Sequence, residues 1–216
     1  MMAQARDRLI VALDVPGTEK ARVMIDTLQD SVGVYKIGIE LLFSGGLSLA
    51  SELAAHGNCV FVDLRDYPMP LYSGDLEAEH GPPQKAAEFK ALLGEYQGVF
   101  IASPEYNSSI TPLLKNTLDW VTRVRGKGET GLEVYKTRVF AISGASPGYY
   151  GAMRSLLTLR QILVVGVGAT VIPQQLALPR ANDAFEEDGS LKDKAQQNML
   201  KDVVEKLAIA AKRFAA

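Results

Sequence analysis

The chain has 216 residues, of which 47% are hydrophobic and 22% are charged, and its net charge is -2 at pH 7. This length suits one well-buried α/β domain and is short for a closed eight-stranded barrel, and the composition is that of a globular protein. The small net charge gives no electrostatic case for nucleic acid or acidic membranes, and the single cysteine, Cys59, excludes an internal disulfide and a cysteine-based metal cluster.

Short apolar runs alternate with amphipathic stretches along the chain, which predicts repeated β-α units and a parallel sheet. Between them, the segment from Tyr67 to Pro83 is rich in Pro, Gly and acidic residues and is expected to be a long functional loop. The predicted strands are Arg8–Val15, Gly33–Ile39, Asn58–Leu64, Gly98–Ser103, Thr137–Ser143 and Thr170–Ile172. The predicted helices are Thr18–Gln29, Gly46–Ala55, Pro82–Tyr96, Thr111–Arg123, Gly151–Val165 and Lys192–Phe214.

Polar residues follow the buried strand Gly98–Ser103 at once, in the run Pro104-Glu105-Tyr106-Asn107. The carboxyl ends of parallel strands are where open α/β sheets bind ligands. Backbone amides and the Asn107 side chain suit the heteroatoms of a planar heterocycle, and Tyr106 offers a flat apolar face. The same residues also fit a plain strand-to-helix connection, in which Asn107 and Ser109 cap the next helix.

A second motif, Ser143-Gly144-Ala145-Ser146-Pro147-Gly148, follows the next predicted strand. Together the two motifs resemble those of the flavodoxin-like NADPH-dependent FMN reductase family, which includes chromate and quinone reductases, and the similarity covers residues 66–216. The resemblance implies a three-layer α/β/α sandwich with a mainly parallel sheet, FMN as cofactor, and NADPH or NADH as reductant. It implies that the flavin ring is held by Pro104, Glu105, Tyr106 and Asn107 and approached by Ser143, Gly144, Ser146 and Gly148. No catalytic residue is assigned, because the flavin itself carries the hydride chemistry.

The first 65 residues carry different motifs, namely Arg8-Leu9-Ile10-Val11-Ala12-Leu13-Asp14-Val15, Val34-Tyr35-Lys36-Ile37-Gly38 and Val60-Phe61-Val62-Asp63-Leu64. They resemble the start of orotidine 5'-phosphate decarboxylase, a (β/α)8 barrel. The stretch that carries the proton chemistry in that family has Arg65 and Pro68 here in place of Lys and Asp. Arg cannot serve as an equivalent proton donor, because its guanidinium stays charged. We expect a chimera-like single α/β domain, with a barrel-like fragment over residues 1–65 and a reductase-like portion over residues 66–216. A protein like orotidine 5'-phosphate decarboxylase is the remote alternative.

Six predicted strands exceed the five of a flavodoxin-like sheet, which are ordered 2-1-3-4-5. We expect Gly33–Ile39 to take the central first-strand place, between Asn58–Leu64 and Gly98–Ser103, with Arg8–Val15 moved to a sheet edge. The alternative places Arg8–Val15 at the centre and displaces Gly33–Ile39.

The reductase resemblance also implies an N-terminal loop of the Gly-Ser-x-Arg-x-x-Ser-x-Asn type, which binds the flavin phosphate at a helix N-terminus. This chain has no such sequence. The nearest substitute is Phe43-Ser44-Gly45-Gly46-Leu47-Ser48, which fits an ordinary helix cap better. We therefore predict weak or absent FMN binding, and a non-catalytic hybrid scaffold of flavodoxin-like fold is the alternative.

By resemblance, the partners are a small-molecule electron acceptor and a second copy of the chain, in a homodimer or homotetramer. The subunit contacts would involve the helix that carries Lys115-Asn116 and Asp119-Trp120. The Arg123, Arg125 and Lys127 cluster fits the phosphate of NADPH, an acidic partner, or a solvated loop. The two histidines lie far apart, so no metal site is expected. No apolar run reaches the length of a membrane span and no signal-peptide pattern precedes the first strand, so we expect a cytoplasmic protein.

Overall fold

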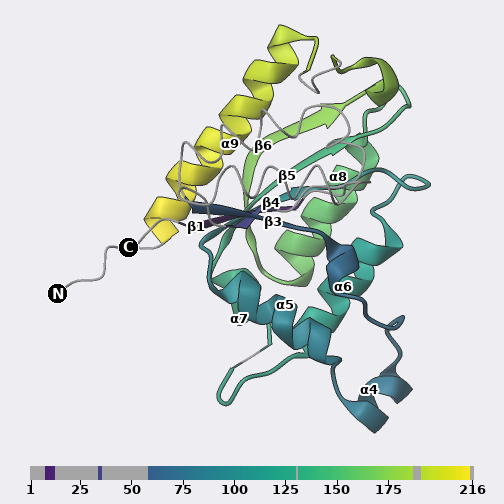
Figure 1. The fold of residues 1–216 in the computed structure, drawn as a ribbon, viewed down its shortest axis with the longest axis vertical. Helices are drawn as coiled ribbons and strands as arrows, with labels where there is room; N and C mark the ends of the chain where they lie inside the picture. Colours follow the sequence, from purple (N-terminus) through teal and green to yellow (C-terminus); the bar gives the residue numbers. More distant parts are fainter. Residues whose placement is uncertain (1–7, 13–33, 36–57, 130, 187–190, 215–216) are drawn as a thin grey trace, which may run out of the picture.

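The computed structural model describes residues 8–12, 34–35, 58–129, 131–186 and 191–214. It contains a six-stranded parallel sheet in the order β2-β3-β1-β4-β5-β6 (Figure 1). The strands are β1 Arg8–Ala12, β2 Val34–Tyr35, β3 Asn58–Val62, β4 Gly98–Ala102, β5 Val139–Ala145 and β6 Thr170–Leu178. The helices are α4 Gly74–His80, α5 Gln84–Gly94, α6 Pro112–Arg123, α7 Glu133–Lys136, α8 Met153–Gln161 and α9 Lys194–Phe214, with short helical turns η1 Leu64–Asp66, η2 Ile162–Gly166 and η3 Ala181–Asp183.

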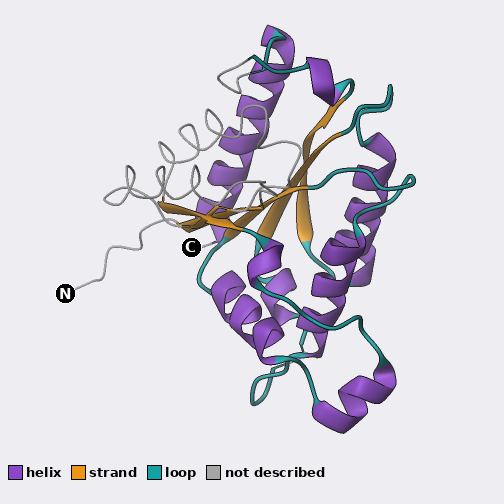
Figure 2. Cartoon of the chain, turned by 45° about the vertical axis from the view of Figure 1, so that its right-hand side comes forward, coloured by secondary structure: helices purple, strands orange, loops and turns teal. Residues whose placement is uncertain are grey.

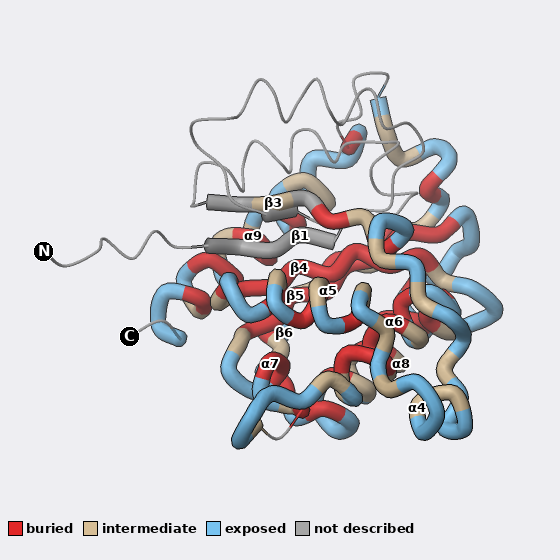
Figure 3. The backbone as a smooth tube through the Cα atoms, turned by 60° about the horizontal axis from the view of Figure 1, so that its bottom comes forward, coloured by how far each residue is buried: buried red, intermediate tan, exposed pale blue. Residues whose placement is uncertain are grey.

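Helices cover both faces of the sheet, as expected for a three-layer sandwich (Figure 2). Successive residues of a strand point to opposite faces. In β4, Val99 and Ile101 join the core shared with α5, α6, α7 and α8, whereas Phe100 joins the core on the other face. That second core is closed by α9, whose buried stripe includes Val203 and Leu207. The middle strands are therefore buried on both faces, and the exposed residues lie in the outer layers (Figure 3).

The strand order corrects the expected topology. β1, not β2, lies at the centre of the sheet, because β1 pairs with β3 on one side and with β4 on the other. Among the described residues, β2 pairs with β3 alone and forms the sheet edge. Without β2, the order β3-β1-β4-β5-β6 is the 2-1-3-4-5 order of flavodoxin-like sheets. A central strand needs enough residues to pair along both of its sides, and the five-residue β1 meets that condition better than the two-residue β2.

Apart from the short helices α4 and α7, which were not predicted from the sequence, the described helices and strands agree with the prediction in type and differ mainly in length. β6 runs to Leu178, well beyond the predicted end at Ile172. Its pairing register with β5 shifts between Phe140 and Ile142, and this bulge accommodates Pro173 in an edge strand. The predicted helices Thr18–Gln29 and Gly46–Ala55 lie outside the described residues.

The segment from Tyr67 to Pro83 is not loop throughout, because it contains α4, which begins after the capping side chain of Ser73. Two α6 side chains hold the start of this segment. Trp120 donates its indole N–H to the Pro70 carbonyl at 2.7 Å, and Asn116 accepts from the Tyr72 amide at 2.8 Å. Trp120 is fully buried. Within the described chain, no helix is long and apolar enough to span a membrane.

Candidate functional site

The two motif loops lie side by side at the carboxyl edge of the sheet. They follow β4 and β5, which are neighbouring parallel strands paired from Gly98 and Val139 onward. The pairing continues into the loops, because the Ser103 amide donates to the Ser143 carbonyl at 2.9 Å. The structure therefore brings the Pro104–Asn107 run and the Ser143–Gly148 run to one place.

Tyr106 to Ser109 form a tight turn after β4. The Tyr106 amide donates to the Ser109 carbonyl at 2.9 Å, and the Ser109 amide donates back at 3.0 Å. Asn107 and Ser108, the central residues, have φ angles of 49° and 67°. Positive φ at both central positions defines a type I′ turn, which Asn tolerates well. The alternative role of Asn107 and Ser109 as helix caps is wrong, because Thr111 accepts from the Leu114 amide at 3.1 Å and caps α6.

Glu105 links the β4 loop to the start of α8. Its side chain is only 5% exposed and its carboxylate forms an ion pair with the Arg154 guanidinium. The same carboxylate accepts from the backbone amides of Arg154 at 3.1 Å and Ser155 at 3.2 Å. Ala152, the residue before α8, provides no side-chain cap, so Glu105 satisfies the free N–H groups of that helix end. Its side chain therefore positions the loop.

The hydroxyls of the second motif are likewise engaged inside the protein. Ser143 is fully buried and its Oγ accepts from the Leu176 amide at 3.3 Å. Ser146 is 8% exposed and its Oγ accepts from the Ala152 amide at 3.1 Å. Gly148 lies at the surface, and its carbonyl accepts from the Arg180 amide at 3.2 Å. The two hydroxyls thus shape the loop, and the Gly148 region is its open part.

Gly144 lies in close contact with the end of β4 and the start of α8. A Cβ at this position would lie 2.5 Å from the Ser103 carbonyl oxygen and 2.8 Å from the Ala152 Cβ. Such distances are far below van der Waals contact, so only glycine fits between the β4 loop and the start of α8.

Exposed aromatic side chains surround these loops. Tyr106 is 51% exposed, and Tyr149 and Tyr150 are 77% and 60% exposed. The rings of Tyr149 and Tyr150 lie edge to face at 5.6 Å, and the Arg154 guanidinium lies 5.0 Å from the centre of the Tyr150 ring. Sequence reasoning stopped at Gly148 and missed Tyr149, Tyr150 and Arg154. An aromatic pair directly after a glycine-rich loop was the signal for them.

The remnant of the decarboxylase motif forms a local ion pair at the end of β3. Arg65 Nη2 lies 2.5 Å from Asp63 Oδ2, and the Arg65 amide donates to Asp63 Oδ1 at 2.8 Å. The strand before it belongs to an open sheet whose further strands are β1 and β4 to β6.

An open parallel sheet in this order, with helices on both faces, defines a flavodoxin-like α/β protein. Among solved structures the chain resembles FerB, a flavoenzyme NAD(P)H:(acceptor) oxidoreductase from Paracoccus denitrificans, with a TM-score of 0.65 and 20% identity over 97% of this chain and 99% of that chain. An oxidoreductase from Corynebacterium diphtheriae gives a TM-score of 0.57 and 15% identity over 98% of this chain and 99% of that chain. At 20% and 15% identity, the similarity to these two structures establishes the fold alone.

The model of the NADPH-dependent FMN reductase family matches residues 47–183, and the model of the orotidine 5'-phosphate decarboxylase / HUMPS family matches residues 7–65. The chain therefore belongs to the NADPH-dependent FMN reductase family, with an N-terminal segment that belongs to the orotidine 5'-phosphate decarboxylase family. The expected chimera-like relationship is confirmed. The two matches overlap over residues 47–65.

Sequence relatives match mainly the N-terminal segment. Orotidine 5'-phosphate decarboxylase of Rhodopseudomonas palustris strain BisB5 is 34% identical over 187 residues, which cover 82% of this chain and 70% of that protein. The decarboxylase of strain HaA2 is 59% identical over 68 residues, which cover 30% of this chain and 29% of that protein. Six further decarboxylases are matched over only 25 to 28% of their own length.

Proposed function

We propose that this chain is an NAD(P)H-dependent FMN reductase-like flavoprotein with weakened FMN binding. The observation that carries the proposal is the meeting of the β4 and β5 loops at the carboxyl edge of the sheet, joined by the Ser103–Ser143 hydrogen bond. When bound, the flavin supplies the hydride chemistry, and the protein supplies binding and orientation.

In this proposal the exposed type I′ turn of Tyr106 to Ser109 contacts the ring system of the flavin. Tyr106 offers its ring, and the Asn107 amide and the loop backbone from Pro104 onward offer polar contacts. Glu105 holds this loop against α8. On the other side, Gly148 and the backbone of the β5 loop face the ring, and Ser143 and Ser146 keep that loop in shape.

Weak binding follows from the residues expected at the flavin phosphate. In flavodoxin-like folds the phosphate loop follows the central first strand, and β1 is the central strand here. The segment that follows Ala12 lies outside the described residues and is considered by its sequence alone. Its sequence, Leu13-Asp14-Val15-Pro16-Gly17-Thr18, brings a carboxylate and a proline without an N–H. The candidate substitute Phe43–Ser48 lies outside the described residues and follows the edge strand β2. Losing two hydrogen bonds to a phosphate, at about 1.5–3 kcal/mol each, weakens binding by about a hundredfold or more.

Titration with FMN and with riboflavin, followed by flavin fluorescence, tests this proposal. We expect both to bind with similar affinity, weaker than about 1 μM, since the ring carries the binding and the phosphate adds little. The variants Tyr106→Ala and Asn107→Ala should weaken both ligands alike. If FMN binds with sub-micromolar affinity and much more tightly than riboflavin, the chain does have a phosphate site and the proposed weak binding is refuted. Absence of binding by both flavins would favour the non-catalytic hybrid scaffold.

Decarboxylation is not part of the proposal, although relatives carry that name. The position that needs a lysine holds Arg65, whose guanidinium is paired with Asp63. The segment belongs to an open sheet in the described part of the chain, in place of a closed barrel.

The electron acceptor is proposed to be a small molecule, and the assembly a homodimer or homotetramer. Of the α6 residues expected in subunit contacts, Asn116 and Trp120 hold the Pro70–Tyr72 segment of their own chain. Lys115 and Asp119 pair with each other at 2.6 Å, and their side chains are 47% and 37% exposed. Subunit contacts through α6 would therefore use its exposed Lys115 side.

A further inference from the structure

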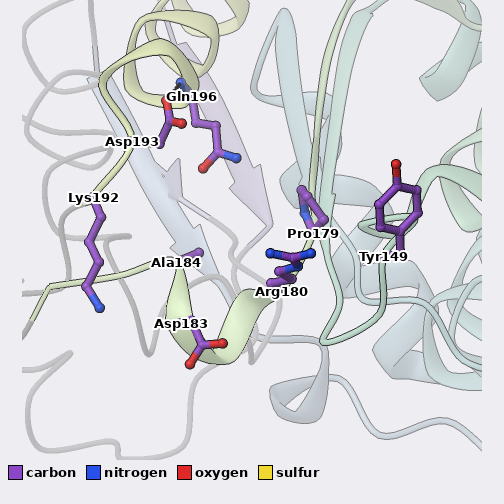
Figure 4. A pocket seen from close by; sticks show the side chains of 8 residues that line it. All are labelled: Tyr149, Pro179, Arg180, Asp183, Ala184, Lys192, Asp193 and Gln196. Carbon is purple, nitrogen blue, oxygen red and sulfur yellow. Dashed lines mark hydrogen bonds between the residues drawn. The ribbon is translucent and has the colours of Figure 1, made fainter.

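A pocket of 510 Å³ lies next to the candidate flavin loops, at the carboxyl end of β6 (Figure 4). This volume falls within the range of about 300–1,000 Å³ that small-molecule sites occupy. The pocket is lined by side chains from the β5 loop, the turn after β6 and the start of α9, namely Tyr149, Pro179, Arg180, Asp183, Ala184, Lys192, Asp193 and Gln196. The β5 loop and the turn after β6 are in contact, since the Arg180 amide donates to the Gly148 carbonyl.

Arg180 and Lys192 are cations without a partner among the described residues. Neither side chain forms an ion pair or a hydrogen bond within that part of the chain, and both residues are exposed. Asp193, in contrast, is engaged, because its Oδ1 accepts from the Ala195 and Gln196 amides at the start of α9. Among the described residues, the pocket therefore offers two positive groups without a partner and the carboxylate of Asp183.

The backbone of Arg180 adds a second observation. Its φ of 51° and ψ of 46° place it in the left-handed region, which is uncommon for a residue with a side chain. Such a conformation persists only where the surroundings hold it, and it is concentrated at ligand sites. Here the Arg180 amide is held by the Gly148 carbonyl and its own carbonyl by the Asp183 amide at 2.9 Å. Figure 4 shows the side chain of Arg180 between Tyr149 and the start of α9.

The Arg123, Arg125 and Lys127 cluster, which the sequence offered for the phosphate of NADPH, does not line this pocket. Arg123 ends α6, with its guanidinium 3.6 Å from Glu77 and 5.0 Å from the Tyr72 ring centre. Arg125 and Lys127 lie in the segment between α6, which starts after the carboxyl end of β4, and β5, which starts at the amino edge of the sheet. By this topology they lie away from the flavin loops. Among the described residues, Arg180 and Lys192 are the cations without a partner that line the pocket next to the flavin loops.

We propose that this pocket binds the adenosine diphosphate moiety of the pyridine nucleotide that serves as reductant, an inference that rests on the proposed function. Arg180 and Lys192 bind the diphosphate through charge-assisted hydrogen bonds. Asp183 accepts from the ribose hydroxyls, as carboxylates do in dinucleotide sites, and Tyr149 provides a flat face for the base. The free carboxylate of Asp183 disfavours a bare phosphate ion and favours a ligand that carries both phosphate and sugar.

The test measures binding of ADP and of inorganic pyrophosphate to the full chain by isothermal titration calorimetry at low salt. Arg180→Gln/Lys192→Gln should weaken ADP binding by about tenfold or more, because charge-assisted bonds are lost. The matched control Arg125→Gln/Lys127→Gln removes the same charge at the other edge and should leave binding unchanged. Asp183→Asn should weaken ADP and leave pyrophosphate equal or tighter. Circular dichroism verifies that each variant is folded.

The outcomes separate this inference from the proposed function. ADP binding that depends on Arg180 and Lys192 supports the pocket even if no flavin binds. If flavin binds and NADPH reduces it, the Arg180→Gln/Lys192→Gln variant should raise KM for NADPH and leave kcat nearly unchanged. An unchanged KM, no ADP binding by the wild type, or an equal loss in the control variant overturns the inference.

Discussion

At the scale of single residues, the candidate site depends on close backbone approach more than on reactive side chains. Gly144 separates the Ser103 carbonyl from Ala152, and Gly151, with a φ of 57°, would place a Cβ 2.4 Å from the Pro179 backbone nitrogen. Each glycine allows one loop to contact another. The buried carboxylate of Glu105 then links the β4 loop to α8, because it accepts from the Arg154 amide, 49 residues later in the chain.

Gly144→Ala tests this close approach. The added methyl meets backbone atoms that have little room to move, so we expect a loss of about 1–3 kcal/mol in the free energy of unfolding, as for other overpacked sites. Gly148→Ala, in the same loop, is the matched control. The nearest atom to its Cβ is Ser146 Oγ at 3.8 Å, so its effect should stay within about 0.5 kcal/mol. Urea unfolding of both variants measures the difference, and equal stabilities would contradict the packing described.

At the scale of elements, a mostly buried ion pair joins α5 to the loop after α6. The Lys90 side chain is 9% exposed, donates to the Val124 carbonyl at 2.6 Å and pairs with Glu129 at 2.7 Å. Glu129 in turn accepts from the Gly126 amide at 3.0 Å. The hydrogen bond from Lys90 lowers the pKa of Glu129 below its ordinary value of 4.5.

This pair predicts a pH-dependent stability. Because the pKa of Glu129 is lower in the folded state, its contribution is present above pH 4.5 and is lost as the pH falls through the folded-state pKa. Lys90→Met should cost about 1–2 kcal/mol at pH 7 and flatten the stability profile below pH 4.5. Lys85→Met, which breaks the exposed Lys85–Glu88 pair, should cost clearly less than Lys90→Met, because solvent screens an exposed pair. Urea midpoints measured from pH 7 to 3.5 provide the comparison; equal losses in both variants would refute it.

At the scale of the whole molecule, one sheet contains strands from both family segments. β1, from the segment matched to the decarboxylase family, pairs directly with β4, which lies in the reductase-like segment. The reductase-like strands β4, β5 and β6 therefore extend a sheet whose central strand comes from the other family.

Proline substitution distinguishes the central strand from the edge strand. In β1, Ile10 pairs with Val60 on one side and Val99 on the other, so Ile10→Pro disturbs both ladders and should cost about 3 kcal/mol or more. Val34→Pro, in the edge strand β2, disturbs pairing with β3 alone and should cost clearly less. Thermal unfolding followed by circular dichroism compares the two. A larger loss for Val34→Pro would mean that the strand order is wrong.

Local patterns in the sequence determined the type of the described strands and of the helices α5, α6, α8 and α9, both family relationships and the position of the β4 and β5 loops after their strands. These features depend on residues that are close together in the sequence, such as the Thr111 cap of α6 and the apolar run of β4. The tertiary structure alone decided that β1 and not β2 is central, because either apolar run could pair with β3 and only long-range packing selects between them. It also decided which side chains are engaged. Glu105 finds its partners on α8, and Tyr149, Arg180 and Lys192 come together across three separate segments, contacts that no local spacing encodes.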